Sequence, residues 1–457
     1  MSEFYERFRA KKTERTSRTE RAEFTAPKPK LDRKRTHAHR HESAERKKFA
    51  SLRRELFAES AIPAESREII EHFDDIVSSV RNLSGKQKVA LYGKIKNLSH
   101  QLTDDRGSRR LGYMNEASYI SAYISYFMWW NLVRMTRLFA NLPKSAFESL
   151  AKSEKPVALD VGSGTLTVVI ALWLARPELR SKKISWYCLD LSQTALSAGE
   201  ELYLAIAAKT LSENAEPWNI IRVKGALGTS IKEKADFIAC ANVFNEILQR
   251  NEQPTDFLAK KYTGDLLSYL KSEDSAVLLV EPGDPHSARF ISLMRDALIR
   301  RDFLPVAPCT HTAECPMAGR TNGRTTNAQG KNAKWCNFAF DTENAPSRLL
   351  KLSEKAGLAK ERASLSFVIS KKFAESVKNQ NGEQETRSEK TFIRIASDFI
   401  RLPDLHKSGY YACSELGLLL AIDEHHIQPK NGELLQIKTP EYLDEIDKKS
   451  GGIIVKL

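Results

Sequence analysis

The sequence is poor in cysteine and has no long apolar segment, and each shortage excludes a class of protein. Six cysteines in 457 residues, with no signal peptide ahead of them, indicate a reducing compartment in which thiolates bind metal or stay buried. The longest uncharged stretch, Ala117 to Val133, has seventeen residues and is interrupted by Ser, Tyr and Asn. A bilayer-spanning helix needs about 20 mostly apolar residues, so we expect a buried helix here and no membrane partner.

Positive charge is concentrated at the start of the chain. The net charge is +13, and residues 1–50 hold 16 Lys and Arg against 8 Asp and Glu, which leaves only +5 for the other 407 residues. A basic tail on a nearly balanced body is typical of proteins that bind nucleic acid, because neutralised phosphates release counterions. The alternative is a tail that only keeps the protein soluble. Its eight acids argue against a mitochondrial transit peptide.

The chain is long enough for several units. We expect a basic disordered tail (1–60), a helical N-terminal domain (61–150), an α/β domain (151–374), a linker (375–390) and a small β-rich C-terminal unit (391–457). Short apolar runs alternate with helical patterns in the α/β domain, which predicts a parallel sheet covered by helices. The expected strands are 157–161, 184–189, 220–223, 237–241, 276–280 and 365–369, with a cysteine-rich insertion at 302–345.

Two glycines follow the first expected strand, in the sequence Asp160-Val-Gly162-Ser-Gly164. Glycine permits a sharp turn and the close approach of a ligand. Asp190 ends the second expected strand, where a carboxylate can accept both hydroxyls of a ribose. A dinucleotide domain would have a third glycine at position 167, but this residue is Thr167. We therefore favour S-adenosylmethionine over NAD as the ligand, and an empty scaffold remains the alternative.

The segment after the fourth expected strand contains no motif that would transfer a methyl group. It reads Cys240-Ala-Asn242-Val-Phe-Asn245-Glu246, without the Asn/Asp-Pro-Pro-aromatic motif of amino methyltransferases or the Pro-Cys nucleophile of cytosine C5 enzymes. We include Asn242 among the cofactor-binding residues, identify no catalytic residue, and interpret Cys188 and Cys240 as core residues.

The other four cysteines are candidate metal ligands. They are Cys309, Cys315, Cys336 and Cys413, separated by five, twenty and seventy-six residues. Four sulfurs suit a tetrahedral zinc ion or an iron-sulfur cluster. Structural zinc usually has paired Cys-x-x-Cys knuckles, so the scattered spacing favours a 4Fe-4S cluster, with zinc as the second choice and four free thiols as the alternative. His311 is a substitute ligand if Cys413 is too distant.

Several of these blocks together resemble the methyltransferase-like family associated with the small ribosomal subunit, which includes a mitochondrial assembly factor and bacterial relatives. The blocks are Asp160-Val-Gly-Ser-Gly164, Val280-Glu-Pro-Gly-Asp-Pro285, Ala307-Pro-Cys-Thr-His311, Cys315-Pro316 and Trp335-Cys-Asn-Phe338. The resemblance covers about residues 110–430. It implies a class I S-adenosylmethionine methyltransferase-like Rossmann domain, a four-iron cluster on Cys309, Cys315, Cys336 and Cys413, and binding to small-subunit rRNA.

The sequence therefore predicts a small-subunit assembly factor that binds rRNA, in the cytoplasm of a bacterium or the mitochondrial matrix of a eukaryote. We expect a monomer when free, with no DNA partner. The rival hypothesis is an active rRNA methyltransferase whose zinc or iron-sulfur site is structural. A radical enzyme would need three closely spaced cysteines, which the observed spacing opposes.

Overall fold

The computed structural model describes residues 53–103, 113–212, 215–272, 274–319, 333–372, 390–402, 406–441 and 443–457. Residues 52–457 pack as one unit. The basic segment 1–50 and the expected linker up to residue 389 lie outside the described residues. Among the described residues, no helix has the length and apolar character that crossing a membrane would require.

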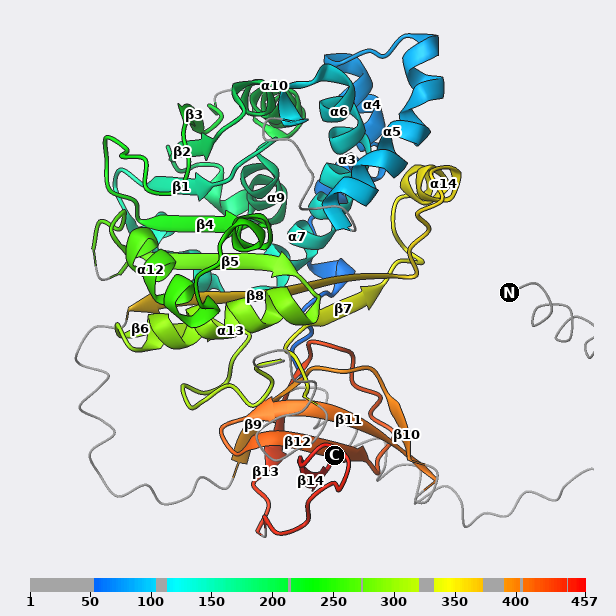
Figure 1. Ribbon diagram of the computed structural model, residues 1–457, viewed down its shortest axis with the longest axis vertical. Coiled ribbons are helices and arrows are strands. Elements are labelled where there is room, and N and C mark those ends of the chain that lie inside the picture. The colour runs from blue at the N-terminus through cyan, green and yellow to red at the C-terminus, as the bar shows by residue number, and fades with distance from the viewer. Residues whose placement is uncertain are drawn as a thin grey trace, which may run out of the picture. The chain divides into compact units, whose positions relative to one another are not determined.

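The larger of two sheets has eight strands in the order β3-β2-β1-β4-β5-β8-β6, with β7 also paired to β8 (Figure 1). Strands β3 to β5 along this path are parallel, whereas β8 runs antiparallel to its neighbours β5, β6 and β7. This mixed α/β sheet with helices on both faces is the class I methyltransferase-like Rossmann fold that the sequence predicted. The strands are β1 Val157–Val161, β2 Ser185–Asp190, β3 Asn219–Lys224, β4 Phe237–Ala241, β5 Ala276–Pro282, β6 Phe303–Ala307, β7 Phe338–Asp341 and β8 Arg362–Lys372.

Alternate residues of the central strands pack into two separate cores, because successive side chains of a strand point to opposite faces. Ala158 of β1 faces one core, in which helices α7 and α9 pack against each other, whereas Leu159 faces the core that contains α12 and α13. Figure 1 shows these helices on the two sides of the sheet. The helices around the sheet are α9 Thr167–Ala175, α10 Gln193–Thr210, α11 Phe244–Ile247, α12 Thr255–Leu267, α13 Pro285–Ile299 and α14 Ser347–Lys355.

The region before the sheet is helical. Its longer elements are α3 Ala64–Glu71, α4 Phe73–Val80, α5 Gly85–Thr103, α6 Ala117–Ala122, α7 Trp129–Asn141 and α8 Glu148–Lys152. The aromatic stretch that the sequence predicts as one buried helix is interrupted by a π-helix, η3, at Tyr123–Met128. Tyr126, Trp129 and Trp130 are fully buried, in agreement with their interpretation as core residues. Single π turns inside helices are rare and occur frequently at functional sites.

Two boundaries of the structure differ from those expected. Strands β6 and β7 lie inside the range 302–345 and both pair with β8, so that range is not wholly an insertion. Both strands are short, and their pairing with a strand further along the chain leaves no periodic signal of its own. Within the expected tail, Arg54 forms a bridge with Leu434, and a short helical turn, η1, begins at Glu59.

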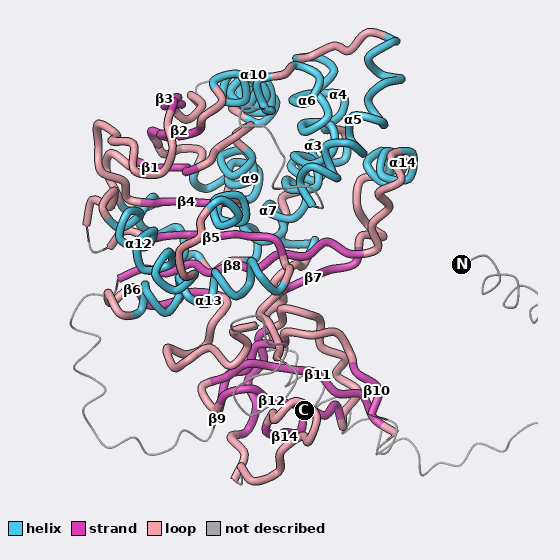
Figure 2. Tube along the Cα trace, viewed as in Figure 1, coloured by secondary structure: helices cyan, strands magenta, loops and turns pink. Residues whose placement is uncertain are grey.

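The C-terminal region forms a second sheet of six strands, in the order β13-β9-β11-β12-β14 with β10 paired to β11. Figure 2 draws the strands of this region in magenta. The strands are β9 Lys390–Ile395, β10 Ile400–Leu402, β11 Lys407–Ser414, β12 Gly417–Asp423, β13 Leu434–Lys438 and β14 Ile453–Lys456. Its own core includes Ile393, Ala412 and Leu419. In the pairing of β9 with β11, Arg394 lies opposite Cys413, so this sheet contributes one of the predicted metal ligands.

Candidate functional site

The glycine turn joins β1 to α9 at the carboxyl end of the parallel strands, where ligands bind in open α/β sheets. Gly162 has a φ of +70°, and a Cβ atom there would lie 2.2 Å from a methyl carbon of Val243. The turn also needs Gly199 of α10, where a Cβ would lie 2.5 Å from the backbone of Thr165. Glycine at these positions lets two neighbouring segments pack directly against the turn.

Asp160, at the end of β1, is buried directly beneath the turn. Only 1% of the residue is exposed, and no hydrogen bond of good geometry reaches either carboxylate oxygen among the described residues. The hydroxyl of Ser163, which donates to the carbonyl of Asp160 (3.0 Å), lies near enough to lower the pKa of the carboxyl group against the effect of burial. Burial raises the pKa of Asp160 to about 7, and the nearby charge of Asp190 contributes to the same shift. A buried carboxyl group without a protein partner is unfavourable, which makes Asp160 a candidate for contact with a ligand.

Asp190 ends β2 and contacts the turn directly. Its carboxylate accepts hydrogen bonds from the backbone N–H of Gly164 (2.9 Å) and of Ser192 (2.8 Å), and burial raises its pKa. Asn242, after β4, has a φ of +56° and donates its N–H to the carbonyl of Val280. Because Val243 is the residue that lies against Gly162, the structure brings Asp160, the glycine turn, Asp190 and the Asn242 segment together.

Glu281, in the last part of β5, holds the segment that follows β4. It is 1% exposed, and its carboxylate accepts backbone hydrogen bonds from Val243 (2.9 Å), Phe244 (2.8 Å) and Asn245 (3.1 Å). Burial raises its pKa to about 8. The side-chain oxygen of Asn245 is buried without a hydrogen-bond partner among the described residues. Sequence reasoning did not assign Glu281 to the site, although it belongs to the Glu-Pro-Gly block.

The helical region also reaches this site through its π-helix. Tyr123 is half-buried, and its pKa is raised to about 12 by burial and then by the charges of Glu246 and Asp190. Its ring stacks on that of Phe127, with 5.9 Å between the centroids. The sequence favoured a core role for this aromatic stretch over a base-stacking role. Tyr123 lies in the π turn, which no sequence pattern signals, and is within electrostatic range of Glu246 and Asp190.

The four candidate metal ligands come from three segments. Cys309 and Cys315 follow β6, Cys336 precedes β7, and Cys413 lies in β11 of the second sheet. The pKa of Cys336 is raised well above its usual value by burial and by the charges of Cys315, Cys309 and Cys413. Burial and the charges of Cys315 and Cys309 likewise raise the pKa of Cys413. The structure therefore gathers all four thiols within electrostatic range of one another.

Backbone hydrogen bonds join the cysteine segments. The N–H of Cys336 donates to the carbonyl of Met317 (2.9 Å), and the N–H of Gly319 donates to the carbonyl of Lys334 (2.8 Å). The structure describes only the two ends of the basic loop from Gly319 to Lys334. The other cysteines, Cys188 and Cys240, are fully buried in the large sheet, as expected for core residues.

Two arginines and one histidine surround the thiols. Arg295 of α13 donates from Nε to Sγ of Cys309 (3.2 Å) and from Nη2 to the carbonyls of His311 (2.8 Å) and Ala313 (2.9 Å). Nε2 of His311 lies 3.1 Å from Sγ of Cys413, and burial, followed by the charge of Arg295, lowers the pKa of this histidine to about 4. Arg394 of β9 donates to the carbonyl of Pro308 (2.9 Å).

The described residues contain no group of three or more His, Cys, Asp or Glu side chains that could hold a single metal ion as they stand, and all six cysteines are unbridged. A zinc ion bound to four cysteines has Zn–S bonds of about 2.3 Å in a tetrahedron, so neighbouring sulfur atoms must lie only about 3.8 Å apart. A four-iron cluster places one iron beneath each thiolate and keeps the sulfurs further apart. Thiolate is the donor that both centres use, and the structure gathers four thiols from three segments of the chain.

Comparison with known proteins adds a family match. The profile of the family described as mitochondrial small ribosomal subunit Rsm22 matches residues 128–396. No curated protein sequence matches the chain. Similar solved structures include a putative RNA methyltransferase from Pyrococcus horikoshii, with 13% identity over 62% of this chain and 100% of that one and a TM-score of 0.29. A putative class I S-adenosylmethionine-dependent methyltransferase from Listeria monocytogenes has 12% identity over 71% and 90% of the two chains, with a TM-score of 0.29.

Proposed function

The chain belongs to the Rsm22 family of the mitochondrial small ribosomal subunit, and from this membership we propose that it is a methyltransferase-like assembly factor that binds small-subunit rRNA. The observation that carries the proposal is the extent of the family match. It runs from residue 128 to residue 396 and so includes the glycine turn and three of the four clustered cysteines. In a eukaryote this function belongs to the mitochondrial matrix, and in a bacterium to the cytoplasm.

We propose that the pocket at the glycine turn holds S-adenosylmethionine. Asp190 would accept the ribose hydroxyls, the glycine turn and Asn242 would contact the nucleoside, and Asp160 would supply negative charge beneath a positively charged ligand. The unpartnered carboxyl oxygens of Asp160 support this assignment, because a cationic ligand would stabilise their ionised form. When bound, the cofactor would supply an activated methyl group.

The four cysteines are proposed to hold a 4Fe-4S cluster, with zinc as the second choice. Thiolate is the ligand that both centres prefer. Three ligands come from the segments beside β6 and β7 and one from β11, so a bound cluster would crosslink the two sheets. Metal binding of this kind contributes directly to folding stability, because the separated ligands of an unfolded chain hold the metal poorly.

Binding to rRNA is proposed to begin at the basic residues 1–50, which carry eight of the thirteen net positive charges. Such contacts recognise phosphate whatever the base sequence. Specificity would then come from the folded region, where Tyr123 and Phe127 are two half-buried rings that stack on each other. Aromatic rings of this kind can stack on unpaired bases.

The rival function is methyl transfer to rRNA, and one observation favours it. The buried, unpartnered oxygen of Asn245 lies after β4, the position from which amino methyltransferases orient the target amine. Against this, the backbone N–H groups of residues 243–245 already donate to Glu281. The backbone of this segment is therefore already held by Glu281, and no residue of the segment is assigned to accept the proton of a target amine.

One experiment separates the two functions. Protein purified without oxygen is incubated with tritiated S-adenosylmethionine and immature small subunits, and the subunits are then sedimented, with mature large subunits as the control. We expect the protein to sediment with the immature small subunits and the rRNA to stay unlabelled. Label in the rRNA would establish the methyltransferase instead. Equal sedimentation with the large subunits would contradict the assembly-factor proposal.

A further inference from the structure

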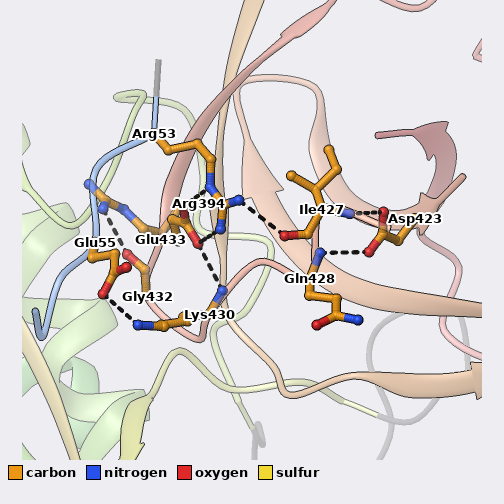
Figure 3. A network of polar contacts seen from close by, with 9 residues as sticks. All are labelled: Arg53, Glu55, Arg394, Asp423, Ile427, Gln428, Lys430, Gly432 and Glu433. Atoms are coloured by element: carbon orange, nitrogen blue, oxygen red, sulfur yellow. Dashed lines mark hydrogen bonds and ion pairs between the residues drawn. The ribbon is translucent and has the colours of Figure 1, made fainter. Parts of the chain in front are cut away.

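Arg394 is a buried cation without an acidic partner. It is 9% exposed, and its two hydrogen bonds go to neutral carbonyls, of Pro308 from Nε and of Gly432 from Nη1, both at 2.9 Å. Figure 3 shows the contact with Gly432. Among the described residues, no carboxylate lies within ion-pair distance of this guanidinium. The next residue, Glu433, binds Arg53 and the N–H of Lys430 instead.

A guanidinium removed from water is unfavourable unless a negative charge lies nearby. The groups that favour the charged form of Arg394 are the thiols of Cys309, Cys336 and Cys413, whereas the nearby charge of Arg54 opposes it. Arg295 stands in the same relation to Cys309 and Cys315. Each of the four cysteines therefore faces at least one of the two arginines. Arg295 also has an acidic partner, because Nη1 binds Asp296 at 2.7 Å.

The charge state of the cysteines decides whether Arg394 is compensated. Four neutral thiols offer no negative charge at all. Four thiolates around a divalent metal ion or a doubly charged four-iron core carry four negative and two positive charges, which leaves a net charge of about −2. This equals in magnitude the charge of two guanidinium groups. The anionic, metal-loaded centre would thus be the counter-ion that Arg394 otherwise lacks, whereas Arg295 also pairs with Asp296.

Resting on the proposed metal centre, we propose that Arg394 and Arg295 are its counter-cations, and that Arg394 makes the docking of the second sheet depend on metal loading. Arg394 belongs to β9 of that sheet and binds the carbonyl of Pro308, which immediately precedes Cys309. With the centre loaded, this contact brings a positive charge to a negative one. With the centre empty, the same contact buries an unpaired charge.

The test is the stability of the full chain, metal-loaded and metal-stripped, for the wild type, for Arg394→Met and for Arg137→Met. Arg137 is a matched control because it is also buried but pairs with Glu59 and lies far in sequence from every cysteine. We expect Arg394→Met to lower the melting temperature of the loaded protein and to leave unchanged or raise that of the stripped protein. Arg137→Met should act equally in both states. If Arg394→Met lowers the melting temperature equally in the loaded and the stripped protein, the inference is overturned.

A second measurement covers the case in which the stripped protein does not fold. The rate at which a chelator removes the metal from the loaded protein is compared for Arg394→Met, Arg394→Lys and Arg137→Met. We expect at least tenfold faster loss for Arg394→Met, a smaller change for Arg394→Lys, which keeps the charge, and none for Arg137→Met. If the chelator removes metal from Arg394→Met at the wild-type rate, the counter-cation inference is overturned but the proposed metal centre is not. A wild-type protein that binds neither iron nor zinc would instead overturn the proposed metal centre.

Discussion

The carboxylate of Asp190 accepts a hydrogen bond from the backbone N–H of Gly164, at 2.9 Å. The residue that the sequence predicts as the ribose ligand therefore also fixes the glycine turn over which the nucleoside would lie. Binding and local structure are coupled at this residue, because any change that weakens its carboxylate affects both.

Asp190→Ala should weaken binding of S-adenosylmethionine by at least tenfold, about 1.4 kcal/mol, because it removes the ribose acceptor and releases the turn. Asp190→Asn keeps one acceptor oxygen and should lose less. Calorimetric titration of each variant measures the effect, with the exposed Asp256→Ala as the control. Equal affinities for the wild type and Asp190→Ala would remove Asp190 from the cofactor site.

Asp160 should make the ligand-free protein less stable as the pH rises from about 4 to about 7. Its pKa in the folded protein is about 7, above the ordinary value of 3.8, so the folded state binds the proton more tightly than the unfolded state does. The contribution of Asp160 is complete below pH 4 and falls by about 1.4 kcal/mol per pH unit up to pH 7. Urea denaturation across this range should show the fall in the wild type relative to Asp160→Asn. Parallel curves for the two proteins would contradict the prediction.

Two substitutions of Glu281 should show how much of the free energy of unfolding depends on its hydrogen bonds to the backbone. Both carboxyl oxygens accept backbone N–H groups, so Glu281→Gln, which turns one oxygen into an NH2 donor, should cost about 1 to 2 kcal/mol. Glu281→Ala leaves three backbone N–H groups without an acceptor and should cost roughly 3 kcal/mol. Chemical denaturation at pH 7 gives both values. A larger loss for Gln than for Ala would show that the side chain is needed for another reason.

Metal analysis tests the cysteine centre. Protein purified without oxygen should be brown and contain about four irons per chain. Cys309→Ser should bleach it, whereas Cys188→Ala, which changes a buried cysteine of the large sheet, should not. Stoichiometric zinc without iron would replace the cluster with a zinc site.

Removal of residues 1–50 should weaken binding to rRNA and reduce its salt dependence. This segment holds a net charge of +8, and each phosphate contact that is lost lowers the slope of log affinity against log salt by about 0.7 to 0.9. Filter binding at several salt concentrations measures the slope. An unchanged slope would favour the alternative that the tail only maintains solubility.

Local patterns in the sequence were sufficient for six of the eight strands of the large sheet. Strands β1 and β4 begin and end at the predicted residues, because five-residue apolar runs between polar segments are strong strand signals. The same patterns gave no indication of β6 and β7, which depend on pairing with β8. They also could not signal the π turn at Tyr123, because one extra residue in a helical turn leaves the aromatic spacing almost unchanged.

The amino-acid sequence by itself determined the chemistry that is available: a glycine turn flanked by two carboxylates, four thiols apart from the core cysteines, and a basic segment at the start of the chain. Only the tertiary structure decided which of these groups meet. It placed Glu281 on the backbone that follows another strand, and it paired Arg394 with Cys413 across two strands of the second sheet. The physical reason is that contacts between residues far apart in the chain are set by strand order and register, which adjacent residues do not encode.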